Sequence, residues 1–495
     1  MISIIKSFIK YETKLFPYLI LIILFGCTPQ ISFISPDKTI IPTTENLNPA
    51  ILPVTTRPIF SPGELVDYIA QNGDTLPALA SHFNTTVSEI RANNPVLPEN
   101  VTTLPSGLPL KIPIYYQPLW GSSFQILPDS LFINGPAQIG FDPVSFVNSK
   151  QGWFKNYEFF AGTRNRIGGE LITHIADNYS ISPRVLLAIL EYQTAALTIE
   201  NNNNSFDDYP LGVQEYVHRG LYRQLLWAAN TLNNGYYGWR TGRLSSFEHT
   251  DGSLERPDPW QNAASVAIQY YFAKVFSPND YQIAVSSQGF SNTYRLLFGD
   301  PWENVIVHIP GSLQQPAMLL PFEAGQKWTY TGGPHTGWGE GDPLSAIDFA
   351  PPAVEGCNRS NEWVTAMADG IIARSEPAVE VLDLDGDGDE RTGWVVFYLH
   401  IGNEGTVPVG TRVKPRQPIG NPSCEGGEAT GTHVHIARKY NGEWIPADGP
   451  LAFNVEGWVA QNGTAPYQGK LVRYGEVIRA CDCSDMASQI QAQTP

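Results

Sequence analysis

The sequence predicts a multidomain protein with a small βααβ module, a mostly α-helical middle domain and a mainly antiparallel β domain toward the C-terminus. Two patterns support this prediction. Apolar residues recur at helical spacing in five segments between positions 168 and 298. From about position 318, short apolar segments alternate with Gly and Pro turns, as in strand-rich domains. The 495 residues are enough for roughly three domains, so core size is not limiting.

The composition favours an exported protein with many loops. Only 16% of the residues are charged, while the chain contains 44 glycines and 40 prolines. The formal net charge of −17 argues against nucleic acid as a partner, because binding to phosphates requires a positive surface.

Residues 1–27 predict a lipoprotein signal peptide. Three lysines and a single acid precede the almost wholly apolar segment 15–26, which is too short to span a bilayer comfortably. The segment ends in Leu-Phe-Gly-Cys and resembles a bacterial lipoprotein signal, which implies that Cys27 is lipidated and anchors the protein to the cell envelope. The alternative is an ordinary signal peptide or membrane anchor with an incidental cysteine. Residues 28–64, rich in Pro and Thr, predict an extended linker.

Residues 65–114 predict a strand, two short helices and a closing strand. Thr75 and Thr86 are the expected N-caps of the two helices. The opening Tyr-x-x-x-x-Gly-Asp-Thr-Leu, the later Ile-x-x-x-Asn-Pro and the closing Leu-Lys-Ile-Pro resemble a LysM domain. This resemblance implies binding to glycans that contain N-acetylglucosamine, and so to peptidoglycan. The alternative is a small α/β module with incidental turn residues.

Residues 115–310 predict a mostly helical domain. The segments with helical spacing are 168–179, 183–197, 213–230, 260–276 and 290–298. The second segment looks like the active-site helix of lysozyme-like lytic transglycosylases, in which a glutamate is the general acid. Gln193 stands at that position, and an amide cannot donate and recover a proton at neutral pH. Glu191, two residues earlier, points elsewhere on a helix. The sequence therefore favours a binding or spacing role, with a plain helical bundle as the alternative.

Residues 311–480 hold a concentration of histidines with one acid. Four of the nine histidines fall here. Because side chains i and i+2 share one face of a strand, His433 and His435 project together. The apolar neighbours of Asp348 can bury, which leaves its carboxylate facing a site. A catalytic zinc takes three nitrogen or oxygen ligands and keeps one position open for water, and two histidines with one aspartate meet that need.

These residues resemble the lysostaphin/LytM-type zinc endopeptidases of bacterial cell walls. The resemblance implies that His335, Asp348 and His435 bind zinc, and that His400 and His433 are the non-ligating catalytic pair. These two would deprotonate the attacking water and stabilise the oxyanion. One feature departs from the family, in which the first His and the Asp are only a few residues apart. Here residues 336–347 separate them, which predicts a looped-out insertion that also offers Asp342 as a rival ligand.

A second metal site is predicted in an acidic segment. Its acids alternate with other residues before glycines and resemble the first half of an EF-hand-type calcium loop. This implies calcium as a further cofactor, with four ligands: Asp383, Asp385, Asp387 and Asp389. The acid expected at loop position twelve is absent, since Trp394 stands there, so a solvated acidic hairpin is the alternative.

Four cysteines remain after Cys27, and in an exported protein they indicate disulfides with three connectivities. Cys357 and Cys424 both lie in predicted loops of residues 311–480, so a bridge between them is one expectation. A bridge between Cys481 and Cys483 would be strained, so cross-pairing stays open. Residues 481–495 are expected to form a tail that frays at its end.

These features together predict a zinc-dependent peptidoglycan endopeptidase. Its LysM domain would hold the glycan while residues 311–480 cut stem or cross-bridge peptide bonds. It would act on the outer face of the cytoplasmic membrane, or in the periplasm or at the outer membrane. The alternative is a non-catalytic wall-binding regulator that activates a separate amidase. A glycosidase is disfavoured by Gln193.

Overall fold

The computed structural model describes residues 57–115, 120–200, 208–303, 305–483 and 485–494, which belong to one unit that spans 54–495. The predicted signal peptide, the lipidation site at Cys27 and most of the predicted linker lie outside the described residues. Within the described ranges, no helix is both long and apolar enough to cross a membrane.

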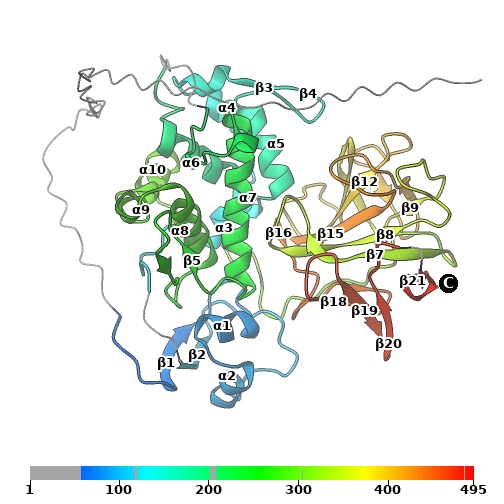
Figure 1. Cartoon of the computed structure of the whole chain (residues 1–495), viewed down its shortest axis with the longest axis horizontal. Helices are drawn as coiled ribbons and strands as arrows, with labels where there is room; N and C mark the ends of the chain where they lie inside the picture. The colour runs from blue at the N-terminus through cyan, green and yellow to red at the C-terminus, as the bar shows by residue number, and fades with distance from the viewer. Residues whose placement is uncertain (1–56, 116–119, 201–207, 304, 484, 495) are drawn as a thin grey trace, which may run out of the picture. The chain divides into compact units, whose positions relative to one another are not determined.

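The predicted βααβ unit is confirmed (Figure 1). Its elements are β1 (Glu64–Ile69), α1 (Leu76–His82), α2 (Val87–Asn93) and β2 (Pro109–Ile114), and β1 pairs with β2 in antiparallel register. Both predicted caps are present: the Thr75 side chain accepts from Ala78 N–H, and Thr86 forms a capping box with Glu89. These caps satisfy backbone donors that two short helices would otherwise leave exposed.

The middle region is mostly helical, as predicted, with two short hairpins. Its helices are α3 (Asp129–Phe132), α4 (Pro143–Asn148), α5 (Gly169–Tyr179), α6 (Pro183–Thr194), α7 (Leu221–Arg240), α8 (Ala263–Val275), α9 (Pro278–Ala284) and α10 (Phe290–Phe298), with 3₁₀ turns η1 (Pro136–Gln138), η2 (Trp153–Asn156) and η3 (Tyr216–His218). Its hairpin strands are β3 (Glu158–Ala161), β4 (Arg164–Ile167), β5 (Phe247–Glu248) and β6 (Leu254–Glu255).

Helix α7 differs most from its predicted range of 213–230. It begins after Gly220, whose φ of +94° is in the left-handed region that favours glycine, and it continues to Arg240. The added turns contain Asn233, Asn234 and Gly235, residue types with low helix propensity. Tertiary packing overrides this propensity, because a Cβ at Gly235 would lie 2.9 Å from Ala267 Cα of α8. The glycine therefore permits the close approach of two helices.

The C-terminal region contains a nine-stranded sheet with the order β13-β10-β11-β12-β15-β8-β7-β21, to which β16 pairs through β15. The pairs within this sheet are antiparallel, as predicted. Its strands are β7 (Lys327–Thr336), β8 (Leu344–Ala350), β10 (Gly370–Glu376), β11 (Ala378–Asp383), β12 (Trp394–Ile401), β13 (Arg412–Val413), β15 (Val434–Tyr440), β16 (Glu443–Trp444) and β21 (Gln489–Gln491). Two smaller sheets comprise β9 (Val364–Thr365) with β14 (Pro418–Gly420), and β17 (Asn454–Val455), β18 (Trp458–Asn462), β19 (Gly469–Arg473) and β20 (Glu476–Arg479), followed by η4 (Met486–Ser488).

The two faces of this sheet bury different cores. Ile347, Tyr398 and Ile436 belong to a core within the C-terminal region. Phe397 and Ala437 point the other way and pack in one cluster with residues of the helical region. Because side chains alternate along a strand, the sheet forms the middle layer between two cores. The helices pack against one face and the smaller sheets against the other.

The prediction of a frayed tail was wrong. Residues 489–491 form β21, which pairs with β7 at the edge of the large sheet, and Ile490 opposite Trp328 is only 1% exposed. The sequence conceals this strand because its single apolar residue stands between two glutamines. The three-residue strand is stable because its backbone groups bond to the edge of β7. An isolated strand of this length would have no partner for these groups.

A buried ion network joins the end of α7 to β16. Arg240 Nε donates to Glu443 Oε1 at 2.8 Å, and Arg240 Nη2 donates to Glu443 Oε2 at 3.0 Å. Tyr236 and His308 also bond to Glu443, at 3.0 and 2.8 Å. Charges removed from water must be paired, so this network ties the helical region to the C-terminal sheet at a defined position.

The connecting segment 309–313 is held by the βααβ unit. The Asn72 carboxamide accepts from the backbone N–H of Ile309 at 3.1 Å and donates to its carbonyl at 3.4 Å. Thr103 Oγ1 donates to the carbonyl of Pro310 at 2.7 Å and accepts from Leu313 N–H at 3.0 Å. The loops of the βααβ unit therefore fix the chain between the helical region and the C-terminal sheet.

The substitution Ile490→Ala should lower the free energy of unfolding by about 2–5 kcal/mol, because it opens a cavity beside Trp328. The matched control Gln489→Ala, at an exposed position of the same strand, should change it little. Urea denaturation followed by tryptophan fluorescence measures both. Equal midpoints for the two variants would mean that β21 does not support the sheet.

Candidate metal centre

Three neighbouring strands bring His335, Asp348 and His435 together. In the β8–β15 ladder His435 lies directly opposite Asp348, so both side chains project from the same face. On β7 the register shifts between Gly332 and His335, and this irregularity turns His335 toward Asp348. The sequence predicts which residues of each strand share a face. The pairing of the three strands, which brings these residues together, depends on the tertiary structure.

The three side chains present their donor atoms to one another. Asp348 Oδ1 lies 3.3 Å from both His335 Nε2 and His435 Nδ1, and these two nitrogens are 2.9 Å apart. All three residues are buried, and their ligand atoms lie within 4.8 Å of one another.

The second ring nitrogens show which form the histidines take. His335 Nδ1 lies 2.8 Å from the carbonyl of Gly333, and His435 Nε2 lies 3.0 Å from that of Gly337. A carbonyl only accepts, so these nitrogens carry the protons and the nitrogens facing Asp348 are bare in the neutral rings. Asp348 Oδ1 is itself buried without a hydrogen-bond donor among the described residues. Two bare nitrogens and a carboxylate in contact fit a metal cation, which would relieve their mutual repulsion.

The electrostatics keep Asp348 ionised and His400 neutral. Burial alone would raise the pKa of Asp348, but positive charge on the protonated forms of His335 and His433, with hydrogen bonds from His335 and His435, outweighs burial and holds that pKa well below its usual range. Burial, followed by the nearby His433 and His435, lowers the pKa of His400 to about 4. At neutral pH the site thus combines an anionic carboxylate at Asp348 with an uncharged imidazole at His400.

His400 and His433 lie beside the three-residue group without joining it. Their ring centroids are 4.5 Å apart, and His433 Nε2 lies 3.9 Å from Asp348 Oδ2. Each Nδ1 donates to a backbone carbonyl at 2.7 Å, that of Glu425 for His400 and that of Gly431 for His433. Both Nε2 atoms therefore keep a lone pair. The His433 side chain is 15% exposed, which is more than that of Asp348 at 7%.

The insertion 337–343 is held by helix α7, and this support was not predicted. Asn230 Oδ1 accepts from Glu340 N–H at 2.8 Å, and Asn234 Oδ1 accepts from Asp342 N–H at 2.7 Å. Asp342 also pairs with Arg243 at 3.1 Å and is not part of the metal-ligand group. The spacing of four between the two asparagines, which puts them on one helix face, is the signal that could have revealed this contact.

Tyr467 is a second residue that sequence reasoning missed. Its ring stacks on His335 with centroids 4.1 Å apart, and its carbonyl accepts from Gly333 N–H at 2.7 Å. Tyr467 belongs to the exposed loop between β18 and β19, where nothing in the local pattern points to a site more than a hundred residues earlier.

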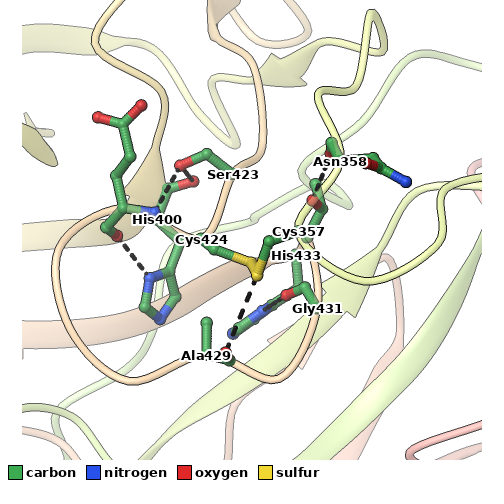
Figure 2. The surroundings of a disulfide bond; sticks show 10 residues. Cys357, Asn358, His400, Ser423, Cys424, Ala429, Gly431 and His433 are labelled. Atoms are coloured by element: carbon green, nitrogen blue, oxygen red, sulfur yellow. Dashed lines mark hydrogen bonds between the residues drawn. A yellow bond between two sulfur atoms is a disulfide. The ribbon is translucent and has the colours of Figure 1, made fainter.

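The structure pairs Cys357 with Cys424 and Cys481 with Cys483, so the cross-paired alternatives do not occur in it. Figure 2 shows the first bridge beside His400 and His433.

The acidic loop between β11 and β12 brings three of its four predicted ligands together: Asp383, Asp385 and Asp387. Asp389 instead pairs with Arg391 at 2.6 Å. Asp383 Oδ2 accepts backbone N–H groups of Gly386 and Gly388, at 3.1 and 2.8 Å. The carboxylates thus already stabilise the turn, and calcium binding stays a prediction.

Gln193 has a structural environment in α6. It accepts from Tyr271 Oη at 2.6 Å and donates to the carbonyl of Leu211 at 2.9 Å. Glu191 accepts from Leu197 N–H at 2.7 Å and from the Thr198 hydroxyl, also at 2.7 Å. Both side chains hold loops that follow helix α6. Because position 193 is an amide, the helix has no carboxylic acid there that could cleave a glycosidic bond.

Comparisons with known proteins divide the chain in a similar way. Residues 125–313 match the family described as "LasA, N-terminal domain". Residues 68–113 match the LysM domain family. The first match replaces the transglycosylase resemblance of α6 as the assignment of the helical region.

Two curated relatives are similar to larger or smaller parts of the chain. Protease LasA of Pseudomonas aeruginosa (strain UCBPP-PA14) is 25% identical over 327 residues, which cover 62% of this chain and 73% of the relative. Beta-lytic metalloendopeptidase of Lysobacter enzymogenes is 30% identical over 142 residues, which cover 27% of this chain and 74% of the relative. Among solved structures, the M23 metalloprotease pseudoalterin from the deep sea shares 25% identity and covers 34% of this chain and 96% of its own, with a TM-score of 0.30.

Each of the substitutions His335→Ala, Asp348→Ala and His435→Ala should strongly reduce bound zinc, because each removes one of three converging ligand atoms. The controls His433→Ala and Asp342→Ala should keep it. Zinc per chain after dialysis, determined by atomic emission, checks all five proteins. Retention in Asp348→Ala together with loss in Asp342→Ala would assign the third ligand to the insertion instead.

Proposed function

The chain belongs to the family of the beta-lytic metalloendopeptidases and combines a LysM domain with a LytM-type metallopeptidase domain, and on this basis we propose that it is a zinc-dependent peptidoglycan endopeptidase. Its substrates would be the stem or cross-bridge peptides of the wall. The observation that carries the proposal is the convergence of two bare imidazole nitrogens and a buried carboxylate, with two further histidines beside them.

A zinc ion held by His335, Asp348 and His435 would polarise the scissile carbonyl and acidify an attacking water. His433 and His400 then handle the proton and the developing charge. Each has its Nδ1–H bound to a backbone carbonyl, so Nε2 of one of the two would accept the single proton that the attacking water gives up and later pass it to the departing amine. Once protonated, the same nitrogen donates a hydrogen bond to the oxyanion of the tetrahedral intermediate.

The LysM domain supports a wall substrate. By binding N-acetylglucosamine-containing glycan, it would raise the concentration of stem peptides near the active site without any new contact there. An exported protein anchored through a lipid on Cys27 would act at the cell envelope, where this substrate lies.

The alternative, a regulator that activates a separate amidase, would need the same wall binding but no turnover. The chain retains all five residues of the proposed site, and they lie together, which favours catalysis over a regulatory role alone.

Zinc-loaded protein from residue 28 onward should release new amino groups from purified wall sacculi, measured by amine derivatisation. The variant His433→Ala should lower the rate about 10²–10⁴-fold, because it removes a general base while the metal ligands remain. His218→Ala, which changes a histidine of the helical region that lies beside Glu215, is the matched control and should keep the activity. Equal and negligible release by wild type and His433→Ala would refute the peptidase proposal and leave the regulator.

A further inference from the structure

His400 has a backbone conformation that residues other than glycine rarely adopt. Its φ is +64°, and it is the extra residue of a β-bulge, because Val379 pairs with Leu399 and Ala378 with Ile401. Strict alternation would put His400 on the face of Tyr398, in the core away from the metal site. The bulge keeps it on the face of Leu399, which lies opposite His435.

Such a conformation persists only where the surroundings enforce it. The segment 423–425 holds His400 at two points (Figure 2). The Ser423 N–H and hydroxyl both donate to the carbonyl of His400, at 2.7 and 3.0 Å. The carbonyl of Glu425 accepts from the ring Nδ1 at 2.7 Å. One contact fixes the backbone and the other fixes the ring.

The segment 356–358 holds the chain next to His433 in the same manner. Thr432 N–H donates to the carbonyl of Gly356 at 2.7 Å, and the Thr432 hydroxyl donates to that of Asn358 at 2.6 Å. His433 N–H also donates to the Ser423 carbonyl at 3.3 Å. Segment 423–425 thus contacts both histidines, and segment 356–358 holds the residue that precedes His433.

The disulfide lies at the centre of both segments. Cys424 stands between Ser423 and Glu425, and Cys357 stands between Gly356 and Asn358 (Figure 2). We infer that the Cys357–Cys424 bridge is a positioning element for the catalytic histidine pair, which holds the His400 and His433 rings in one arrangement. The inference rests on the proposed function, since it assigns the bridge a part in turnover.

Few other interactions stabilise the two segments that the bridge joins. In the described chain, residues 351–363 and 421–433 contain no helix and no strand, and their β pairing is limited to single bridges of Pro422 with Ile401 and of Ser423 with His433. Cys357 and Glu425 are exposed, so the hydrogen bonds of these segments compete with water. Without the covalent link, the two segments could separate and let His400 relax from its left-handed conformation.

The metal ligands have separate support. Asp348 and His435 pair within the sheet, and the outer ring nitrogens of His335 and His435 bind the carbonyls of Gly333 and Gly337. None of these groups belongs to residues 356–358 or 423–425. Loss of the bridge should therefore separate turnover from metal binding.

The test uses the full chain with Cys357→Ser and Cys424→Ser together. Zinc content should equal that of wild type, and the apparent KM for suspended wall sacculi should change less than about twofold. The kcat should fall about 10- to 100-fold, because small misplacements of catalytic groups have effects of this size. Ser423→Ala, with the bridge intact, should lower kcat in the same direction because it removes one contact to His400.

The matched control removes the other bridge through Cys481→Ser and Cys483→Ser and should leave kcat unchanged. Melting temperatures of all variants separate stability from turnover. A wild-type kcat in the Cys357/Cys424 variant, even with a lower melting temperature, would show a merely structural bridge and overturn the inference alone. Loss of zinc together with kcat would overturn it as well, since the bridge would then support the whole centre. An inactive wild type would overturn both the inference and the proposed peptidase.

Discussion

The buried carboxylate of Asp348 constrains the architecture of the C-terminal sheet. An ionised group removed from water must be compensated, and the compensation comes from strands on both sides of β8. The β15 register puts His435 opposite it, and the irregularity in β7 turns His335 toward it. Because both imidazoles present bare nitrogens, the arrangement fits a cation better than a hydrogen-bond donor. A slip of one residue in either ladder would turn a ligand to the opposite face.

The helical region contributes to the site from outside the peptidase domain. It packs against the sheet face that carries Asp348 and His435, in one core with Phe397 and Leu399. Its longest helix also holds the insertion after His335 through Asn230 and Asn234. The end of that helix is joined to β16 by the Arg240–Glu443 pair. The position of the insertion therefore depends on residues about a hundred positions earlier.

The centre is supported in two separate ways. Sheet hydrogen bonds and backbone carbonyls hold the three residues of the candidate metal centre, whereas irregular loops joined by a disulfide contact His400 and the chain next to His433. Regular strands give a rigid ligand set, and a bulge is needed where a side chain must leave the strand alternation. The strained backbone of His400 marks the place where function and regular structure conflict.

Local patterns in the sequence determined much of this protein. The caps at Thr75 and Thr86 and the alternation around Asp348 and His435 depend on neighbours within a few residues, so they could be predicted. Long-range contacts decided the rest. Packing on α8 extends α7 through Gly235, and a free edge on β7 recruits the strand that contains Ile490. Asp342 pairs with Arg243 and lies outside the group formed by His335, Asp348 and His435, a placement that its turn-like sequence does not reveal. These outcomes depend on which surfaces meet after folding, and a one-dimensional pattern does not contain that information.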